Sequence, residues 1–348
     1  MVVFDCERMK HPNTGLSVFC DNVASCLVRQ RSTLRGSLCL YVPGKFCGHW
    51  GNDVGYRKVC LVDRLHVFCD RSVKVWHSAH QQTSYIPPRG VRQVLTVHDL
   101  NFLYEKPIRK HRRYLSALQK HIDRADYIVA ISESTRRDLV DNIDMKGKPV
   151  EVVYNGLNHF DGDIVPPVSR PEGKFLFSVG TVLPKKNFHV LPVLLKDNDY
   201  KLIIAGNKSS YEKKIMEEAA NFGVQDRVSI IGPVTDSVKY WYIKNCSAFL
   251  FPSMAEGFGL PVIEAMYYQK PIFLSDRTSL PEIGGNHVFY FDHNFEPDAM
   301  VAQFKNGLKL FADGGVDKEL MKQHALSFSW ERTARRYIEI YNDLLSGL

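Results

Sequence analysis

The sequence predicts an α/β protein with two domains of similar size. Short, mainly apolar runs, such as residues 175–179 and 248–251, alternate with segments whose apolar residues recur at helical spacing. This alternation is typical of βαβ units around a parallel sheet. A chain of 348 residues has the length of about two domains. Residues 161–173 contain three prolines and show no periodicity, so we expect them to join one domain to the next.

Strands are predicted where a short apolar run lies between polar, glycine-containing loops. In the first half these runs are residues 2–4, 38–42, 59–62, 73–76, 94–100, 125–131 and 150–154. In the second half they are residues 175–180, 200–206, 228–234 and 248–251. Residues 41–55 show no clear periodicity, so no element is predicted there.

Helices are predicted where apolar residues recur every three or four positions. The segments run from Leu16 onward, over 106–124 and 133–140, up to Leu195, and over 210–222, 236–245, 262–268 and 330–345. Ser132 and Ser329 stand directly before two of these segments, where an N-cap residue is expected.

Composition indicates an ordinary soluble protein, with 45% hydrophobic and 24% charged residues. No run of 18 apolar residues occurs, so we expect no transmembrane helix. The first residues, MVVFDCERMKH, lack the pattern of a signal peptide. Seven of the eight cysteines precede residue 70 without any C-x-x-C pair. Scattered reduced thiols in a cytoplasmic enzyme are therefore expected, although disulfides or a metal site are the alternative.

All the excess positive charge lies in the first half. Residues 1–168 contain 24 Lys and Arg against 17 Asp and Glu, whereas the remainder contains 21 of each. One segment, residues 106–124, combines an apolar stripe with many cations and a single acid, Asp123. The stripe consists of Ile108, Leu115, Leu118 and Ile122, and the cations are Arg109, Lys110, Arg112, Arg113, Lys120 and Arg124.

This polarised helix predicts an anionic partner for the first domain. An anionic membrane surface, met through residues 106–124, is the partner that we expect, with the apolar stripe packed on the domain's own sheet. Nucleic acid is a poorer candidate, because stacking would require aromatic residues among the cations and the segment has only Tyr114.

The stretch from residue 248 to residue 283 combines features of an anion site. An apolar run is followed by a loop with Glu256, and Pro261 then begins a helix that places Glu264 in its first turn. Free amides of Gly257, Phe258, Gly259 and Leu260 would suit an anion. Taken singly, Glu264 could merely complement the helix dipole, and Glu256 could be a solvated loop acid.

The combination is more specific. Glu256, then Gly-Phe-Gly-Leu-Pro, then Glu264 and an apolar run ending in Ser-Asp resembles the nucleotide-sugar signature of the retaining glycosyltransferases of family 4. The resemblance implies the GT-B fold, in which two Rossmann-like domains face a central cleft and a C-terminal helix crosses back to the first domain. The domains would be residues 1–165 and 166–328, with the crossing helix at 329–348. In the family the first glutamate lies by the donor sugar and the second binds the ribose hydroxyls.

Further elements resemble the family's donor site. Gly15 stands in the first loop, where the family has its donor-phosphate glycine, and His98 in HDLNFL matches the histidine that lies against the donor sugar. Lys185 and Lys186 match the cations that bind the donor diphosphate. Thr181 stands where many members have an arginine, so one cation of the family is either absent or supplied from elsewhere.

The sequence therefore predicts transfer of a sugar, with mannose as first guess, from a nucleoside diphosphate to a hydroxyl of a glycan or lipid-linked acceptor in envelope polysaccharide synthesis. Retention of configuration is expected. No metal ion or other cofactor is expected, because no DxD-like motif stands at a candidate site. The predicted catalytic residues are His98, Lys186 and Glu256. The predicted donor-binding residues are Gly15, Lys185, Lys186, Gly257, Phe258, Gly259, Leu260 and Glu264.

Two alternatives remain at this point. A GT-B epimerase or hydrolase would act on a nucleotide sugar without any acceptor. A basic nucleic-acid-binding protein would lack catalysis altogether.

Overall fold

The computed structural model describes residues 1–12, 14–60, 70–83, 85–158, 160 and 162–347. The chain divides into two compact units, which we describe separately. Unit 1 contains Met1–Gly156 and Phe328–Leu348, and unit 2 contains Leu157–Ser327. The sequence places the boundary later, between residues 165 and 166. The proline-rich segment belongs to unit 2 because Val165 N–H donates to Ser237 Oγ at 2.8 Å, and this hydroxyl donates to the Asp163 carbonyl.

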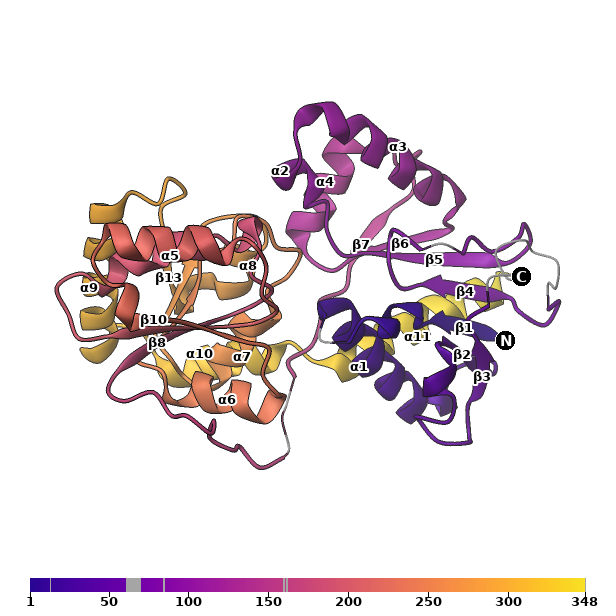
Figure 1. Ribbon diagram of the computed structural model, residues 1–348. Helices are drawn as coiled ribbons and strands as arrows, with labels where there is room; N and C mark the ends of the chain where they lie inside the picture. The colour runs from indigo at the N-terminus through magenta and orange to yellow at the C-terminus, as the bar shows by residue number, and fades with distance from the viewer. Residues whose placement is uncertain (13, 61–69, 84, 159, 161, 348) are drawn as a thin grey trace. The chain divides into compact units, whose positions relative to one another are not determined.

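Unit 1 is built on a seven-stranded parallel sheet in the order β3-β2-β1-β4-β5-β6-β7 (Figure 1). The interior strands are almost fully buried, as expected of a parallel sheet with both faces covered. The strands are β1 (Val2–Asp5), β2 (Leu38–Val42), β3 (Gly55–Lys58), β4 (Val75–Ser78), β5 (Arg92–Val97), β6 (Tyr127–Ala130) and β7 (Val150–Val152).

One strand of this sheet differs from the prediction. The edge strand β3 covers Gly55–Lys58, whereas the sequence predicts a strand over 59–62. Of the predicted range, residues 61 and 62 lie outside the described residues. An edge strand with exposed Gly55 and Lys58 needs no apolar run, and this is why the pattern missed it.

Helices and short 3-10 turns join the strands of unit 1. They are η1 (Glu7–Lys10), α1 (Gly15–Arg29), η2 (Arg31–Thr33), η3 (Gly44–Phe46), α2 (Phe102–Glu105), α3 (Ile108–Arg124), α4 (Glu133–Asn142) and α11 (Trp330–Ser346). The Ser132 and Ser329 hydroxyls accept N–H groups of α4 and α11, so both predicted N-caps are confirmed.

The terminal helix α11 is part of unit 1 and lies along α1 (Figure 1). It is fixed at its first turn by Thr333 Oγ1, which donates to the Tyr154 carbonyl at 2.6 Å. Further along, Arg336 forms a two-pronged ion pair with Glu151 on β7. These contacts attach the last helix to the sheet edge at β7.

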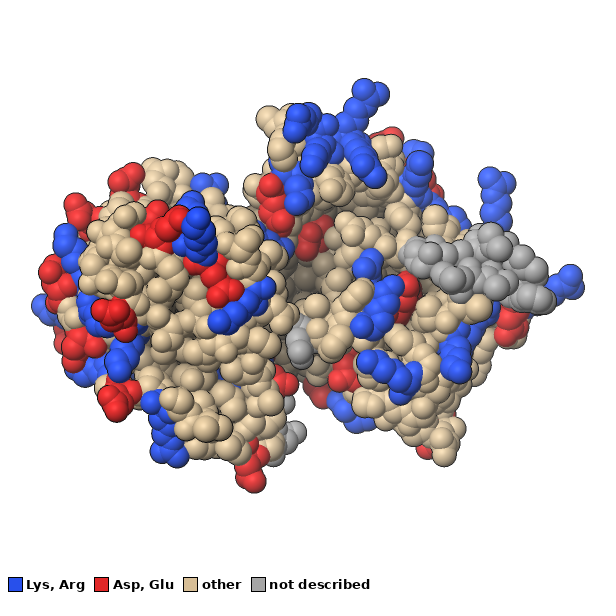
Figure 2. Space-filling view, viewed as in Figure 1, with Lys and Arg blue, Asp and Glu red and all other residues tan. Residues whose placement is uncertain are grey.

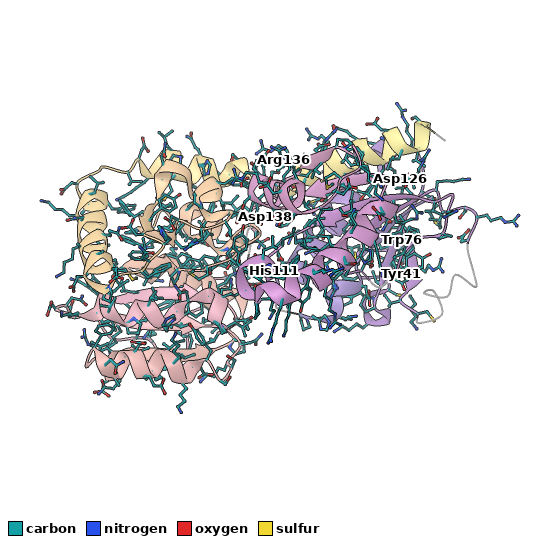
Figure 3. The ribbon with its side chains drawn as sticks, turned by 90° about the horizontal axis from the view of Figure 1, so that it is seen from above. Tyr41, Trp76, His111, Asp126, Arg136 and Asp138 are labelled. Atoms are coloured by element: carbon teal, nitrogen blue, oxygen red, sulfur yellow. The ribbon has the colours of Figure 1, made fainter. Side chains whose placement is uncertain are left out.

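A cluster of three aromatic rings packs in the core of unit 1, next to strands β2 and β4. The rings of Tyr41 and Trp76, labelled in Figure 3, have centroids 5.1 Å apart, and Tyr85 lies 4.1 Å from Trp76. Seven cysteines of the chain are described, and none of these forms a disulfide. Cys69 lies outside the described residues.

Unit 2 is built on a six-stranded parallel sheet in the order β10-β9-β8-β11-β12-β13. The order reverses direction between β8 and β11, which defines a topological switch point. The strands are β8 (Phe175–Val179), β9 (Lys201–Ala205), β10 (Val228–Gly232), β11 (Ala248–Phe251), β12 (Ile272–Ser275) and β13 (Phe289–Phe291).

Helical segments cover both faces of this sheet (Figure 1). They are η5 (Pro184–Lys186), η6 (Phe188–Leu195), α5 (Glu212–Asn221), η7 (Gln225–Arg227), α6 (Asp236–Asn245), α7 (Leu260–Tyr267), α8 (Leu280–Gly284), η8 (Gly285–His287), α9 (Pro297–Ala312) and α10 (Lys318–Ser327). The helix predicted up to Leu195 is the 3-10 segment η6, which has Pro192 inside it.

Candidate active site

The switch point of unit 2 brings two loops together. Strands β8 and β11 are parallel neighbours, so the loops at their carboxyl ends leave the sheet side by side. The β8 loop leads to Lys185 and Lys186, and the β11 loop leads to Glu256. The Met254 N–H donates to the Lys185 carbonyl at 2.7 Å and joins the two loops directly. Ligands of open α/β sheets bind at this place.

Lys186 and Glu256 form an ion pair at this point, between Nζ and Oε1. Their side chains are only 14% and 13% exposed. The Lys186 ammonium also lies 4.6 Å from the centre of the Phe251 ring, at the end of β11. The structure therefore brings together two of the predicted catalytic residues, which are 70 positions apart in the chain.

Backbone conformation explains the residue that follows the lysines. Asn187 has φ of +57° between η5 and η6, a left-handed value that asparagine and glycine tolerate best. Gly206, after β9, packs against the same loop, because a Cβ there would lie 1.9 Å from the Gly180 carbonyl oxygen. Both residues serve to place the loop that carries Lys186.

Two residues that the sequence analysis did not single out hold the Glu256 loop. Thr278 Oγ1 accepts the Glu256 N–H at 3.0 Å, and Ser279 Oγ lies 3.0 Å from the carbonyl oxygens of Glu256 and Phe258. Both follow β12, the next strand of the sheet after β11. The sequence signal that could have identified Thr278 and Ser279 is their position, as hydroxyl residues, shortly after the apolar run of β12 (Ile272–Ser275).

Helix α7 begins next to this loop. Gly259 has φ of +105° and precedes the helix, so a side chain there would be strained. In the first turn Pro261 has no N–H, and the Val262 N–H donates to the Gly259 carbonyl at 2.9 Å. An N–H group at a helix N-terminus without such a partner favours an anion nearby. Glu264 occupies the fifth position of α7, because the helix begins at Leu260. The prediction that Glu264 lies in the first turn is therefore wrong by one residue.

Glu264 is 2% exposed and is surrounded by donors. Its Oε1 accepts from Asn158 Nδ2 at 3.0 Å, from Lys239 Nζ at 3.1 Å and from the Tyr240 hydroxyl at 3.1 Å. Sequence analysis missed all three donors. Lys239 and Tyr240 are adjacent on α6 with nothing in their pattern to mark them, and Asn158 is brought in only by the fold.

Unit 1 contains a second group of polar residues, at the carboxyl ends of β4 and β5. His98 is buried, and its Nε2–H donates to the Ala79 carbonyl at 2.8 Å, since a carbonyl can only accept. The lone pair is therefore on Nδ1. The backbone N–H of His98 donates to Gln81 Oε1 at 3.0 Å. The Phe19 ring packs edge-on against the His98 ring, with 4.6 Å between the ring centres. Burial lowers the pKa of His98 to about 4, so the ring is neutral at pH 7.

His80 lies beside His98 and was not predicted. Its Nδ1 accepts the Gln82 N–H at 2.9 Å and lies 3.2 Å from Arg8 Nη2. Burial lowers the pKa of His80 well below its usual value, and the charge of Arg8 acts in the same direction. Burial also raises the pKa of the nearby Asp5 to about 7. The sequence signal that could have identified His80 is its position after β4, because His98 follows the neighbouring strand β5 in the same way.

Gly15 is the first residue of α1, behind the N-cap Thr14. A Cβ at Gly15 would meet no atom within 4 Å. Contacts with the rest of unit 1 therefore do not require glycine at this position.

Helix α3 confirms the predicted concentration of cations but differs in two details. Lys and Arg side chains gather over it in the upper part of Figure 2. Ile108 is 84% exposed, so the prediction that it packs on the sheet is wrong, whereas Leu118 and Ile122 are buried. Arg124 turns inward, where its guanidinium donates to the carbonyls of Pro88 and Val91. The exposed cations of the helix are Arg109, Lys110, Arg112, Arg113 and Lys120.

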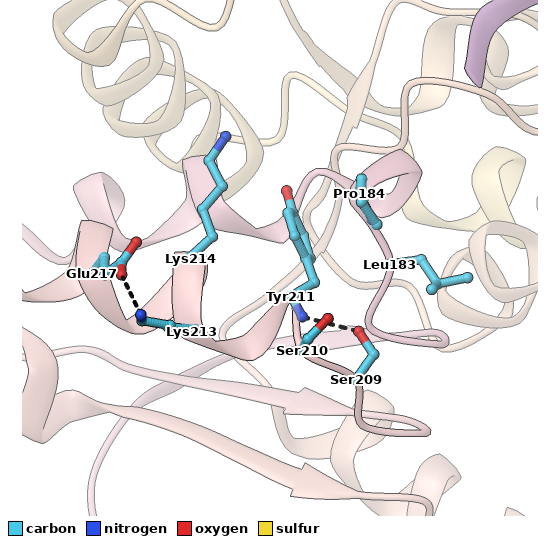
Figure 4. A pocket seen from close by; sticks show the side chains of 8 residues that line it. All are labelled: Leu183, Pro184, Ser209, Ser210, Tyr211, Lys213, Lys214 and Glu217. Atoms are coloured by element: carbon cyan, nitrogen blue, oxygen red, sulfur yellow. Dashed lines mark hydrogen bonds and ion pairs between the residues drawn. The ribbon is translucent and has the colours of Figure 1, made fainter. Parts of the chain in front are cut away.

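A pocket of about 400 Å³ lies between η5 and the start of α5 (Figure 4). Tyr211 in its wall is bound through its hydroxyl to His189 Nδ1 at 2.5 Å, and Lys213 faces Glu217 at 3.8 Å. None of the predicted site residues lines this pocket.

Within the described residues, no three His, Cys, Asp or Glu side chains are grouped as a metal site would require. Among the helices of the same residues, none combines the length and the apolar character needed to cross a bilayer.

Comparison with known proteins agrees with the fold and the loops. The family Glycosyltransferase Family 4 matches residues 62–159, and the family Glycosyl transferases group 1 matches residues 163–311. The chain belongs to the family 4 glycosyltransferases.

Among curated relatives, O-antigen chain mannosyltransferase RfbU of Salmonella typhimurium is 25% identical over 219 residues, which are 62% of this chain and 60% of that protein. The match therefore spans less than two thirds of that relative. O-antigen chain mannosyltransferase B of Escherichia coli is 26% identical over 285 residues, which are 75% of this chain and 73% of the relative.

Solved structures support the fold. Sucrose-phosphate synthase from Thermosynechococcus elongatus has a TM-score of 0.75 at 13% identity and covers 100% of this chain and 99% of its own. The lipopolysaccharide outer core galactosyltransferase WaaB has a TM-score of 0.65 at 18% identity over 97% of this chain and 99% of its own. The predicted fold class, with two Rossmann-like domains and a C-terminal helix, is confirmed.

Proposed function

We propose that this protein is a retaining glycosyltransferase that moves a sugar from a nucleoside diphosphate to a hydroxyl of a glycan or lipid-linked acceptor. The proposed setting is envelope polysaccharide synthesis at the cytoplasmic face of a membrane. Mannose is the first candidate sugar, because two relatives are named O-antigen chain mannosyltransferases. The proposed reaction needs no metal ion.

The observation that carries this proposal is the Lys186–Glu256 ion pair at the switch point of unit 2. A nucleoside diphosphate that leaves a sugar accumulates negative charge, and a poorly solvated ammonium stabilises such charge without reorienting first. Lys185 stands next to Lys186, and the backbone of Gly257, Phe258, Gly259 and Leu260 leads into the N-terminus of α7. In this proposal these groups hold the diphosphate.

The proposed chemistry can be followed bond by bond. The bond from the sugar C1 to the phosphate oxygen breaks, and its electron pair stays on the phosphate. The acceptor oxygen bonds to C1 on the same face, and its proton passes to the departing phosphate oxygen. Glu256 keeps Lys186 in place and lies by the sugar, while Glu264 accepts hydrogen bonds from the ribose hydroxyls.

Unit 1 supplies the remaining proposed roles. Neutral His98, with its lone pair on Nδ1, can accept a hydrogen bond from a sugar hydroxyl. Gly15 leaves room for a phosphate at the start of α1. The exposed cations of α3 suit the head groups of an anionic membrane, where each Lys or Arg contributes roughly 1 kcal/mol.

The test is a screen of GDP-mannose, UDP-glucose and UDP-galactose for thermal stabilisation, followed by assays with and without a lipid-linked oligosaccharide. A donor at about 100 times its Kd should stabilise the fold by about 2.7 kcal/mol. We expect release of the nucleotide only when the acceptor is present, and an α-linked product from an α-linked donor. Conversion of the nucleotide sugar without acceptor would instead indicate an epimerase or hydrolase.

A further inference from the structure

Glu264 is a carboxylate in an unusual place for a charge. Its neighbours along α7, Val262, Ile263, Ala265 and Met266, are all buried and apolar. An ionised group with 2% exposure is stable there only if a cation and hydrogen bonds replace the lost water. The identity of those partners therefore decides whether Glu264 can serve as a ligand-binding carboxylate.

Lys239 is the cation that meets this requirement. Its Nζ lies 3.1 Å from Oε1 and 3.1 Å from Oε2 of Glu264. The lysine is itself held, because Asp236 Oδ1 lies 3.1 Å from the same Nζ and the Tyr240 ring lies 4.3 Å from it. Only 16% of the Lys239 side chain is exposed. Burial alone would lower the pKa of Lys239, but the carboxylates of Glu264 and Asp236 outweigh it and raise the pKa.

The two oxygens of Glu264 are used unequally. Oε1 takes hydrogen bonds from three donors of the protein, namely Lys239, Tyr240 and Asn158. Oε2 is buried and, among the described residues, accepts no hydrogen bond, although the Lys239 ammonium faces it at 3.1 Å outside hydrogen-bonding geometry. A carboxylate oxygen can accept two hydrogen bonds. Oε2 is thus the atom with acceptor capacity left for a ligand.

We propose that Lys239, assisted by Tyr240, is the positioning residue that holds the Glu264 carboxylate in place and turns its Oε2 toward the ribose of the donor. This inference rests on the proposed function, which assigns the ribose to Glu264. It adds that α6, through Lys239 and Tyr240, determines how well the site distinguishes a ribose from a deoxyribose. Sequence analysis placed neither residue at the site.

The discriminating measurement is affinity for GDP and UDP compared with 2′-deoxy-GDP and 2′-deoxy-UDP, by titration calorimetry. A hydrogen bond to a charged group contributes about 1.5–3 kcal/mol, so the unchanged protein should prefer its ribonucleotide by on the order of tenfold or more. Lys239→Met keeps an apolar stem over Tyr240 but removes the charge. It should lower that preference to within about twofold while kcat stays within about threefold, because ground-state and transition-state binding weaken together.

Three variants make the test specific. Lys239→Arg keeps the charge and should retain most of the ribose preference, and Tyr240→Phe, which removes one donor to Oε1, should lose part of it. Lys244→Met changes an exposed lysine of the same helix and should leave the preference unchanged. Circular dichroism and melting curves establish that each variant is folded. If Lys239→Met does not fold, the ratio of ribonucleotide to deoxyribonucleotide affinity in Tyr240→Phe tests the proposal instead.

The outcomes separate the two proposals. Suppose that the unchanged protein prefers the ribonucleotide, that Glu264→Gln abolishes this preference and that Lys239→Met keeps it. The role of Lys239 is then refuted, while the proposed donor site stands. If the unchanged protein shows no preference, the ribose role of Glu264 fails and the role of Lys239 fails with it.

Discussion

The hydroxyl of Tyr341, on the terminal helix α11, lies 2.5 Å from Nδ1 of His77 on β4, and both residues are completely buried in unit 1. On its other side the His77 ring reaches Thr96 Oγ1 at 2.7 Å, and this hydroxyl lies 2.9 Å from the hydroxyl of Tyr337. A continuous chain of hydrogen-bonded polar groups therefore joins helix α11 to the middle of the sheet. Such a chain is costly to interrupt, because an unpaired polar atom would stay buried.

Tyr341→Phe should therefore lower the free energy of unfolding of unit 1 by about 1–3 kcal/mol, since Nδ1 of His77 loses its partner without access to water. The measurement is urea unfolding followed through tryptophan fluorescence, because Trp76 and Trp330 are buried in unit 1. Tyr104→Phe is the matched control. Its hydroxyl also bonds a partner, Asp138 at 2.7 Å, but on an exposed side chain. An equal loss in both variants would contradict the argument.

Unit 1 should lose stability on mild acidification. Burial lowers the pKa of His77 to about 3 and that of His98 to about 4, while an unfolded histidine titrates near 6.5. Between pH 6.5 and 4 the unfolded chain therefore binds protons that the folded unit does not, so stability falls as pH falls. His80 acts in the same direction. Asp5 opposes them, since its pKa of about 7 in the fold exceeds the unfolded 3.8.

Burial also lowers the pKa of His121 and raises that of Asp138, so four histidines of unit 1 stand against two aspartic acids. The histidines prevail, and each unopposed proton contributes at most about 1.4 kcal/mol per pH unit. Urea unfolding at about pH 7.5, 6.5 and 5.5 measures this slope. His80→Gln removes one of the titrating groups and should reduce the slope by about 1.4 kcal/mol per pH unit. A free energy that does not change over this range would refute the prediction.

Activity should survive chelation by EDTA, while Lys186→Ala should lose on the order of 10²–10³ in kcat, as removal of one transition-state donor does. The initial rate of nucleotide release is the measurement, and Lys185→Ala is measured beside it to compare the two lysines. A strict need for a divalent ion would disprove the use of lysine in place of a metal. A mild loss for Lys186 with a severe loss for Lys185 would move the role by one residue.

The two glutamates should differ in the kinetic constant that they affect. Glu264→Ala should mainly weaken donor binding and raise KM, because ribose contacts exist in the ground state and in the transition state alike. Glu256→Ala should mainly lower kcat, since it frees the Lys186 ammonium from its fixed position. Steady-state kinetics with varied donor concentration separates the effects. If both variants keep kcat and KM within about threefold, the site has been misplaced.

Helix α3 should bind vesicles that contain anionic lipid. Co-sedimentation should fall when Arg109, Lys110, Arg112 and Arg113 are all changed to Glu, and also at about 0.5 M salt, where charges are screened within a few ångströms. Because Ile108 is 84% exposed, Ile108→Ser should weaken binding that persists at high salt. Binding indifferent to lipid charge, to salt and to the four changes would mean that the helix is simply a solvated surface.

The elements that sequence analysis predicted best have strong local signals. Helix α6 covers Asp236–Asn245 as expected, and the buried run Ala248–Phe251 is the strand β11. Where the local signal is weak the prediction failed. The edge strand β3 has polar, exposed residues, and Ile108, the first residue of α3, is exposed although it continues the apolar stripe of that helix.

The candidate site shows the same limit. Lys186 and Glu256 could be found because each belongs to a short motif that lies within a single loop. Lys239 and Asn158 could not, because each meets Glu264 through a contact between residues that are 25 or more positions apart and leaves no periodic trace in the sequence. Such residues become visible only when the chain is folded.

Because α11 completes unit 1, the order in which the ribosome makes the chain differs from the order in which the units can be finished. Unit 2 is one unbroken stretch, Leu157–Ser327, and can fold as soon as it has emerged. The sheet of unit 1 emerges earlier, yet the surface that receives Tyr337 and Tyr341 stays uncovered until α11 has been synthesised. Truncation just before Trp330 would thus impair the unit made first and spare the unit made second.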